Sequence, residues 1–507
     1  MLIFLFLAIY SIALGFRIYW LSQKDSFMID EGLSVTLASY NDYMWTKNYD
    51  LSREYTGKEV KEISLCDNDS LKNVFEDIFR LWKDNRDSPH TNLYYSFLRL
   101  SLAGLKTGDI KIIILRGGIL NIFFFTLSFI FFFLLMRLLF PELLLMQYLA
   151  ALCAFLSTGT ITNTVLLRPY QLQETLFIVF CYFLFKTINE KKYIIQDKNI
   201  YLYFKTMFLL SAVTAVTLLT GYYSIILILL FGFYIIFINR KNHQEILYYV
   251  FILFLGLILA QSLYSRYFLG FIGYRSQETT ATLFNDFFGN FIFSMNKLVS
   301  LFNIHFFTWI TIALCLLCVF YLLIRKNKII IQKNALCIFA VMLLYSVSVM
   351  LLAPYKEIRY ILPVFPFLVI LPVIIFNSIG KWKVSAAIML LLCISFSVNA
   401  SNRNNIEYLY QNKNESYSFN KDIDVPVFVL NNVMWKYADL IPYFNDEQKY
   451  FFIDSSDDID LTQLNEFYFI HDASLEIPGF DKTQFDVYEL GGYINSFFKG
   501  RKYIKNN

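Results

Sequence analysis

Two adjacent carboxylates, Asp30 and Glu31, follow shortly after the first apolar stretch of the chain. Carboxylates at the edge of a bilayer are costly, so their presence there favours a functional site. Asp30 is suited to act as a general base that accepts a proton from an attacking hydroxyl group. Because neighbouring helical residues point about 100° apart, we expect Glu31 to have a different task, such as orienting an arginine, a substrate group or a divalent ion. The simpler alternative is that the two carboxylates cap the next helix.

Three arginines, Arg116, Arg168 and Arg359, stand near the ends of other apolar stretches. A guanidinium group near hydrocarbon needs an anion, and its planar fork fits a phosphate. Arg168 also precedes Pro169, which presets a helix start whose exposed amides attract anions. The alternative for each arginine is that it extends its charged end to the membrane interface. A shared location near Asp30 favours a phosphate-binding set.

A second polar cluster comprises Asp87 and His90, in the segment Asp87-Ser88-Pro89-His90. As a lone histidine, His90 can be a structural hydrogen-bonding group or a metal ligand. Together with Glu357, these residues are candidates for contacts with an acceptor or a metal ion. Whether a divalent metal is needed stays open at this point, and no other cofactor is implied.

The composition places these residues in a membrane protein. The chain has 507 residues, of which 57% are hydrophobic and 17% charged, a balance typical of α-helical polytopic membrane proteins. Hydropathy predicts about eleven transmembrane helices. We place them at residues 1–21, 112–136, 145–163, 168–187, 202–220, 222–239, 246–264, 306–324, 335–353, 361–379 and 384–399. The net charge of +4 needs no nucleic-acid partner, because the basic residues lie in short loops between spans.

The distribution of lysine and arginine predicts the orientation. With a cytoplasmic amino terminus, most basic residues of the short loops lie inside, in agreement with the positive-inside rule. Residues 22–111 and the chain after residue 400 then lie outside the cytoplasm. We therefore expect a transmembrane module over 1–399, with a long outer loop at 22–111, and a separate outer domain over 400–507.

The two outer parts show different patterns. In the loop, apolar residues at helical spacing between Asn68 and Trp82 predict an amphipathic helix on the membrane surface or against the bundle. After residue 400, short β-like runs at 425–430, 449–453 and 466–470 and a short helix at 435–440 predict a small α/β domain.

Several short motifs in this order resemble the GT-C membrane glycosyltransferases, in particular the branch with the protein O-mannosyltransferases and the aminoarabinose transferase that modifies lipid A. The resemblance covers about residues 1–380. Its motifs are Asp30-Glu31, Asp87-Ser88-Pro89-His90, Leu93-Tyr94-Tyr95, Arg116, Arg168-Pro169-Tyr170, Thr220-Gly221-Tyr222-Tyr223, Arg359-Tyr360, Pro363 and Pro366. Two departures concern metal binding: Thr91 and Asn92 follow His90 where many relatives have two prolines, and Gly221 stands before Tyr222 where a histidine is common.

The resemblance implies transfer of a sugar from a polyprenyl-phosphate donor to a lipid, glycan or protein acceptor at the extracytoplasmic face. A bacterial inner membrane is the expected location. The implied catalytic residues are Asp30 and Glu31. Those implied to bind the donor phosphate are Arg359, Arg116, Arg168, Tyr360, Tyr170 and Tyr222.

Two other classes of protein remain as alternatives. A flippase for polyprenyl-linked glycans, or another multi-pass transporter, should show charges at the membrane midplane and repeated halves, and the sequence shows neither clearly. An accessory or assembly protein would have no need for Asp30 and the arginines.

Overall fold

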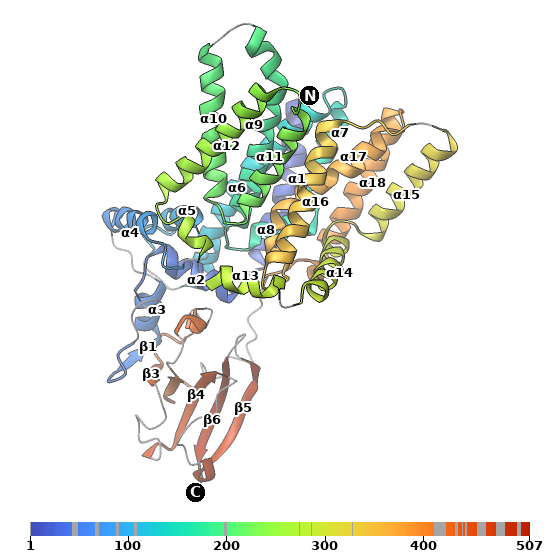
Figure 1. Ribbon diagram of the computed structural model, residues 1–507. Helices are drawn as coiled ribbons and strands as arrows, with labels where there is room; N and C mark the ends of the chain where they lie inside the picture. Colours follow the sequence, from blue (N-terminus) through green and yellow to red (C-terminus); the bar gives the residue numbers. More distant parts are fainter. Residues whose placement is uncertain are drawn as a thin grey trace. The chain divides into compact units, whose positions relative to one another are not determined.

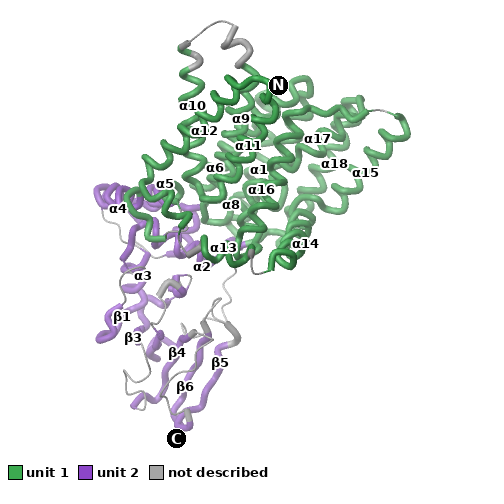
Figure 2. Tube along the Cα trace, viewed as in Figure 1, with its two compact units in different colours: residues 1–23, 82–94, 118–407 green, residues 24–81, 95–117, 408–507 purple. Residues whose placement is uncertain are grey.

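The structure is a computed structural model that describes residues 2–506 except 43–48, 66–69, 88–90, 106–108, 197–199, 273, 285, 327, 410–421, 431–433, 439, 442–443, 454–462, 473–481 and 494–497. The chain forms two compact units, coloured separately in Figure 2. Unit 1 contains residues 1–23, 82–94 and 118–407, and unit 2 contains residues 24–81, 95–117 and 408–507. The outer domain expected over 400–507 is thus joined in unit 2 by much of the first polar loop.

Unit 1 is a bundle of apolar helices (Figure 1). The α-helices lying mostly in this unit are α1 (Leu2–Ser22), α6 (Ile110–Leu139), α7 (Leu144–Leu156), α8 (Thr158–Val165), α9 (Tyr170–Gln196), α10 (Ile200–Leu218), α11 (Ser224–Ile238), α12 (His243–Leu263), α13 (Tyr274–Phe284), α14 (Phe287–His305), α15 (Trp309–Ile324), α16 (Lys333–Leu352), α17 (Ile370–Asn377) and α18 (Trp382–Ala400). The 3-10 helices are η1 (Phe268–Phe271), η2 (Ile358–Tyr360), η3 (Leu362–Val369) and η4 (Arg403–Asn405).

The described helices confirm an α-helical polytopic membrane protein. Five of them, α1, α6, α12, α16 and α18, are long and apolar enough to cross a bilayer, and up to seven spans result if each of two bent helix pairs is one span. Three shorter apolar segments, Phe204–Leu218, Ser224–Ile238 and Leu362–Asn377, also coincide with predicted spans. The one remaining predicted span, 168–187, lies on α9. Every predicted span therefore falls on helical chain, although several are shorter or more bent than hydropathy indicates.

The bends have local causes. α7 and α8 meet at 57° around Ser157, whose backbone is extended, and α14 and α15 meet at 91°. The span predicted over 361–379 begins as the 3-10 helix η3, because Pro363 and Pro366 cannot donate backbone hydrogen bonds. Gly159 allows the close approach of η3 to α8, since a Cβ atom at this position would lie 2.6 Å from the Phe365 ring. The broken helices thus pack against one another.

Unit 2 is built around one six-stranded sheet with the strand order β1-β3-β2-β4-β6-β5. Its strands are β1 (Glu54–Thr56), β2 (Val427–Leu430), β3 (Lys449–Ile453), β4 (Glu466–Asp472), β5 (Phe485–Tyr493) and β6 (Phe498–Lys505). β2 pairs in parallel with β3 and β4, whereas the pairs β1–β3, β4–β6 and β5–β6 are antiparallel. The first loop therefore supplies an edge strand to a sheet made mainly from the end of the chain.

The sheet is stabilised by buried aromatic rings. On one face, Phe467 stacks on Tyr503 with ring centroids 4.9 Å apart and meets Phe428 edge-on at 5.6 Å. Such pairs contribute about 0.5–1.5 kcal/mol each beyond their burial. The other face is also buried: Tyr450 and Tyr468 are at most 2% exposed. Burial on both faces explains why β2, β3 and β4 are nearly continuous apolar runs.

The predicted elements of the outer domain are largely present. The three predicted β-like runs correspond to β2, β3 and β4, and the short helix predicted over 435–440 is the 3-10 helix η6 (Met434–Tyr437). β1, β5 and β6 were not predicted. The remaining helices of this unit are α2 (Ile29–Ala38), α3 (Gly57–Leu65), α4 (Leu71–Lys83), α5 (Leu93–Ser101) and η10 (Lys482–Gln484).

The amphipathic helix predicted between Asn68 and Trp82 is α4. Val74 and Leu81 are buried, whereas Leu71, Phe75 and Phe79 are 71%, 62% and 71% exposed. These three residues recur every four positions and form an apolar stripe on one helix face. An exposed apolar stripe on a helix with charged flanks is typical of helices that lie on a membrane surface.

Candidate active site

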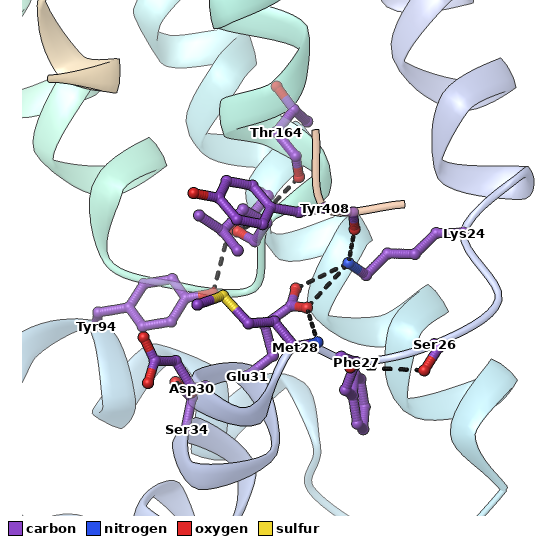
Figure 3. Close-up of polar contacts among 12 residues, drawn as sticks. Lys24, Ser26, Phe27, Met28, Asp30, Glu31, Ser34, Tyr94, Thr164 and Tyr408 are labelled. Atoms are coloured by element: carbon purple, nitrogen blue, oxygen red, sulfur yellow. Dashed lines mark hydrogen bonds and ion pairs between the residues drawn. The ribbon is translucent and has the colours of Figure 1, made fainter. Parts of the chain in front are cut away.

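Helix α2 carries the two predicted catalytic carboxylates (Figure 3). It begins after Met28, whose backbone N–H donates to Glu31 Oε2 at 2.7 Å. Glu31, at the third helical position, is thus the side chain that closes a capping box. The helix-cap alternative therefore applies to Glu31.

Glu31 is also one half of a buried ion pair. Lys24 Nζ lies 3.0 Å from both carboxylate oxygens of Glu31, and neither side chain is exposed to solvent. Lys24 Nζ donates a further hydrogen bond of 2.5 Å to the Tyr408 carbonyl. Burial lowers the pKa of Lys24, and the charge and hydrogen bond of Glu31 oppose this shift. The lysine therefore ties the start of α2 to the chain segment at Tyr408.

This arrangement gives Glu31 a structural task. Its predicted catalytic role, or a role in orienting an arginine, a sugar or a divalent ion, stays a prediction; its partners in unit 2 include Lys24 and the Met28 amide. Asp30 differs: its side chain is only partly buried, and Figure 3 shows its carboxylate pointing away from that of Glu31. The predicted divergence of the two side chains is present, and Asp30 is the less buried of the two.

In unit 1, Arg359 lies on η2, immediately before the broken helix that contains Pro363 and Pro366. Its side chain is 8% exposed, and its Nε lies 3.2 Å from Glu357 Oε2. The Arg359 guanidinium also lies 5.2 Å from the Tyr360 ring centroid. Glu357, predicted to contact an acceptor or a metal ion, is thus in the first place a counter-charge to this arginine.

Two of the three predicted tyrosines meet beside Arg359. The Tyr360 ring is edge-on to Tyr170 at 6.2 Å and to Tyr223 at 5.9 Å. Tyr222 lies in another cluster, 5.5 Å from Tyr267 and 5.0 Å from Phe271. The structure therefore places Tyr223, rather than its predicted neighbour Tyr222, next to Tyr360.

Arg168 lies in the connection between α8 and α9 and is 4% exposed. Asn121 donates to the carbonyls of Thr164 and Leu166 at 3.0 and 2.8 Å, and Asn163 donates to the Tyr170 carbonyl at 3.3 Å. Buried amides that satisfy these carbonyls fix the course of the connection. Arg168 and Tyr170 are therefore held on a rigid segment.

A buried network supports the same connection. Arg17, fully buried in α1, donates through Nε to Thr164 Oγ1 at 3.0 Å, and Thr164 donates to Gln171 at 2.8 Å. Gln171 and Asn163 each donate to the Glu174 carboxylate at 2.9 Å. The sequence offered one signal for this network: an arginine inside an apolar span marks a functional or paired position.

The remaining predicted site residues are Arg116, Asp87 and His90. That Arg116 meets an anion or a carboxylate stays a prediction; within unit 2 its guanidinium donates to the Ala103 carbonyl at 2.7 Å. Asp87 closes a local turn that starts at Asn85, because the Asp87 backbone N–H donates to Asn85 Oδ1 at 3.0 Å. His90 lies outside the described residues. Among the residues that are described, no three histidine, cysteine, aspartate or glutamate side chains gather closely enough to hold a metal ion.

Comparison with known proteins identifies the architecture. A crystal structure of ArnT from Cupriavidus metallidurans bound to undecaprenyl phosphate matches 98% of this chain and 97% of its own, with a TM-score of 0.52 and 10% identity. The apo structure of the same protein matches equal shares of both chains, with a TM-score of 0.53 and 11% identity. The chain has the GT-C fold. No protein-family model and no curated protein sequence matches it.

Within this GT-C fold, the structure reveals polar residues that sequence reasoning missed. His305, at the end of α14, is 1% exposed and lies 3.8 Å from Glu407, measured between Nε2 and Oε1. Thr158, at the start of α8, lies 3.0 Å from His305 Nδ1. No sequence motif connects these three residues, which come from distant parts of the chain. Their only signal was a histidine and a serine-threonine run at the ends of apolar stretches.

Proposed function

We propose that the protein is an integral membrane glycosyltransferase that transfers a sugar from a polyprenyl-phosphate donor to an acceptor. The observation that carries this proposal is Arg359, a buried guanidinium beside Tyr360 and Tyr170 at a broken helix of a GT-C bundle. The full-length likeness to an ArnT structure that binds undecaprenyl phosphate supports it. A buried cation at such a position is well suited to a lipid phosphate.

In the proposed reaction, Asp30 and Arg359 have separate roles. The acceptor hydroxyl oxygen attacks the anomeric carbon, and its proton passes to Asp30 acting as general base. The bond between the anomeric carbon and the phosphate oxygen breaks, and its electron pair leaves with the polyprenyl phosphate. Arg359, with Arg168 as a second cation, stabilises the charge that develops on this phosphate. The Lys24–Glu31 ion pair holds the start of α2, the helix that carries Asp30.

We further propose that the reaction takes place at the extracytoplasmic face of a bacterial inner membrane. The lysine and arginine content of the short loops supports this orientation. The exposed apolar stripe of α4, which suits a membrane surface, supports it as well. The acceptor is a lipid, a glycan or a protein that reaches this face.

The test is a transfer assay with purified protein in liposomes. Polyprenyl phosphates carrying radiolabelled glucose, mannose or aminoarabinose are incubated with a membrane lipid, glycan and protein fraction, and labelled products are separated from donor. We expect label in an acceptor and release of polyprenyl phosphate. Movement of intact donor across the bilayer without a product would support a flippase instead.

Arg359 provides a prediction for the donor site. Arg359→Ala is expected to lower kcat/KM for the donor severely, by about 10²-fold or more, because a charge-assisted phosphate contact is lost. Arg359→Lys should recover only part of the activity, because lysine lacks the planar fork. Measured donor turnover of Arg359→Ala at the wild-type level would exclude this role and leave Arg168 and Arg116 as candidates.

A further inference from the structure

His305, in unit 1, is a buried histidine with only one of its two ring nitrogens hydrogen-bonded within the described part of the chain. The side chain is fully buried, and its Nδ1 lies 3.0 Å from Thr158 Oγ1. Its Nε2 has no hydrogen-bond partner among the described residues. Leaving a buried polar atom without a partner costs about 1–3 kcal/mol, so such an atom calls for an explanation.

The unsatisfied Nε2 faces a carboxylate. Glu407 Oε1 is 3.8 Å away, which is too far for a direct hydrogen bond, and the Glu407 side chain is half-exposed. A backbone hydrogen bond of 3.2 Å from the Glu407 amide to Thr162 Oγ1 fixes this part of the chain to α8. A buried nitrogen and a half-exposed carboxylate oxygen thus face each other at the edge of the bundle.

Two polar atoms 3.8 Å apart are at a separation that one hydroxyl group can bridge. A hydroxyl can accept one hydrogen bond and donate another, and its oxygen can lie ~2.8 Å from both a histidine nitrogen and a carboxylate oxygen. Nε2–H can donate to it when Thr158 donates to Nδ1, and the ionised Glu407 accepts its proton. The pair is therefore suited to a neutral hydroxylated ligand.

The surroundings relate this pair to Arg359. Glu407 interacts electrostatically with Lys297 and with Glu357, and Glu357 lies 3.2 Å from Arg359 Nε. The segment η3, which follows Arg359, also packs on the histidine, with the Phe365 ring 6.0 Å from the His305 ring. The hydroxyl-binding pair and the proposed phosphate-binding arginine therefore share the same group of broken helices.

We propose that His305 and Glu407 bind a hydroxyl group of the donor sugar, with Thr158 positioning the histidine. This inference rests on the proposed function, because a sugar attached directly to a lipid phosphate must lie within a few ångströms of the phosphate site. His305 and Glu407 then determine which sugars are used. They contribute to binding the donor and not to binding a polyprenyl phosphate that has no sugar.

The test compares two ligands. Binding of undecaprenyl phosphate, and turnover of the sugar-linked donor that the wild type uses, are measured for Glu407→Ala, His305→Gln and the wild type. We expect kcat/KM for the donor to fall about 10–100-fold in Glu407→Ala, which loses a hydrogen bond to a charged group, and about 2–10-fold in His305→Gln, which loses one between neutral groups. The Kd for undecaprenyl phosphate should change less than twofold, which also shows that the variants fold.

Matched variants distinguish a loss of His305 positioning from a general loss of structure. Thr158→Val should lower donor kcat/KM because Nδ1 loses its partner, whereas Thr158→Ser keeps the hydroxyl and should retain most of it. Glu142→Gln, an exposed carboxylate elsewhere in unit 1, should have no effect.

Three results would overturn the inference. Wild-type donor turnover in Glu407→Ala and His305→Gln would exclude sugar contacts, and equal losses for both ligands would indicate a structural role. In either case the proposed function survives. A wild-type protein that binds undecaprenyl phosphate but uses no sugar-linked donor would instead overturn the proposed function together with the inference.

Discussion

Replacing Asp30 with asparagine is expected to lower the rate of sugar transfer by about 10²–10⁴-fold, the usual contribution of a general base. Asparagine keeps the size of the side chain but cannot take the proton of an attacking hydroxyl. Donor binding should be retained, because the residues proposed to bind the phosphate and the sugar are unchanged. The measurement is single-turnover transfer with saturating donor, alongside donor affinity.

The structure removes one alternative explanation for such a loss. The start of α2 is capped by Glu31, and asparagine caps helices about as well as aspartate, so Asp30→Asn should leave helix stability almost unchanged. Chelator treatment of the wild type and added metal with the variant provide the control for a metal-binding role. A full rate for Asp30→Asn would contradict the base, and would favour an acceptor such as a phosphate that arrives already ionised.

Replacing Lys24 with methionine is expected to destabilise unit 2 by about 3–5 kcal/mol, because it leaves the buried Glu31 carboxylate without its cation. The double variant Lys24→Met/Glu31→Gln should regain much of this loss, since neither charge then remains buried. Stability is measured by denaturant unfolding in detergent, followed through a probe in unit 2.

An exposed pair supplies the control for this experiment. Lys72 and Glu76 on α4 are 3.7 Å apart with side chains 83% and 52% exposed, so Lys72→Met should have little effect. If Lys24→Met were as mild as Lys72→Met, the Lys24–Glu31 pair would not be what holds α2, and Glu31 would not have the structural role that its buried ion pair indicates.

The membrane part of the fold could be predicted because its signal is local. A run of apolar residues long enough for a bilayer is visible in any window of the sequence. The bend at Ser157 was not visible, because serine and threonine are compatible with a continuous apolar helix. The 3-10 start at η3 could be anticipated from Pro363 and Pro366, which interrupt the predicted span.

The sheet shows the opposite case. β2, β3 and β4 could be predicted because burial on both faces makes them continuously apolar. β6, with Lys499, Arg501 and Lys502, has a mixed composition that hides it. β1 is three residues long, and its only stabilising partner strand among the described residues is distant in the sequence. Strand pairing between residues far apart in the sequence leaves no local sequence pattern.

Some residues of the candidate site could likewise be predicted from the sequence, and others could not. Asp30, Glu31 and Arg359 could be identified because charge near an apolar run is unusual in itself. The partner of Glu31 could not be identified, since several basic residues were equally available and only the folded chain brings Lys24 to it. The same holds for His305 and Glu407, which approach each other only through the packing of broken helices.

The pairing of β1 with β3 has a consequence for how the protein is made. Tyr55 lies opposite Tyr450, so roughly 400 residues must be synthesised after the first before the second exists, a delay of roughly 20–80 s at typical translation rates. Tyr49, which stacks on Phe452 at 4.0 Å, must wait equally long for its partner. During that time the first loop lacks its partner strand, and its aromatic residues are exposed to non-native contacts. A chain that terminates before β3 therefore loses the whole of this unit and not merely its last segment.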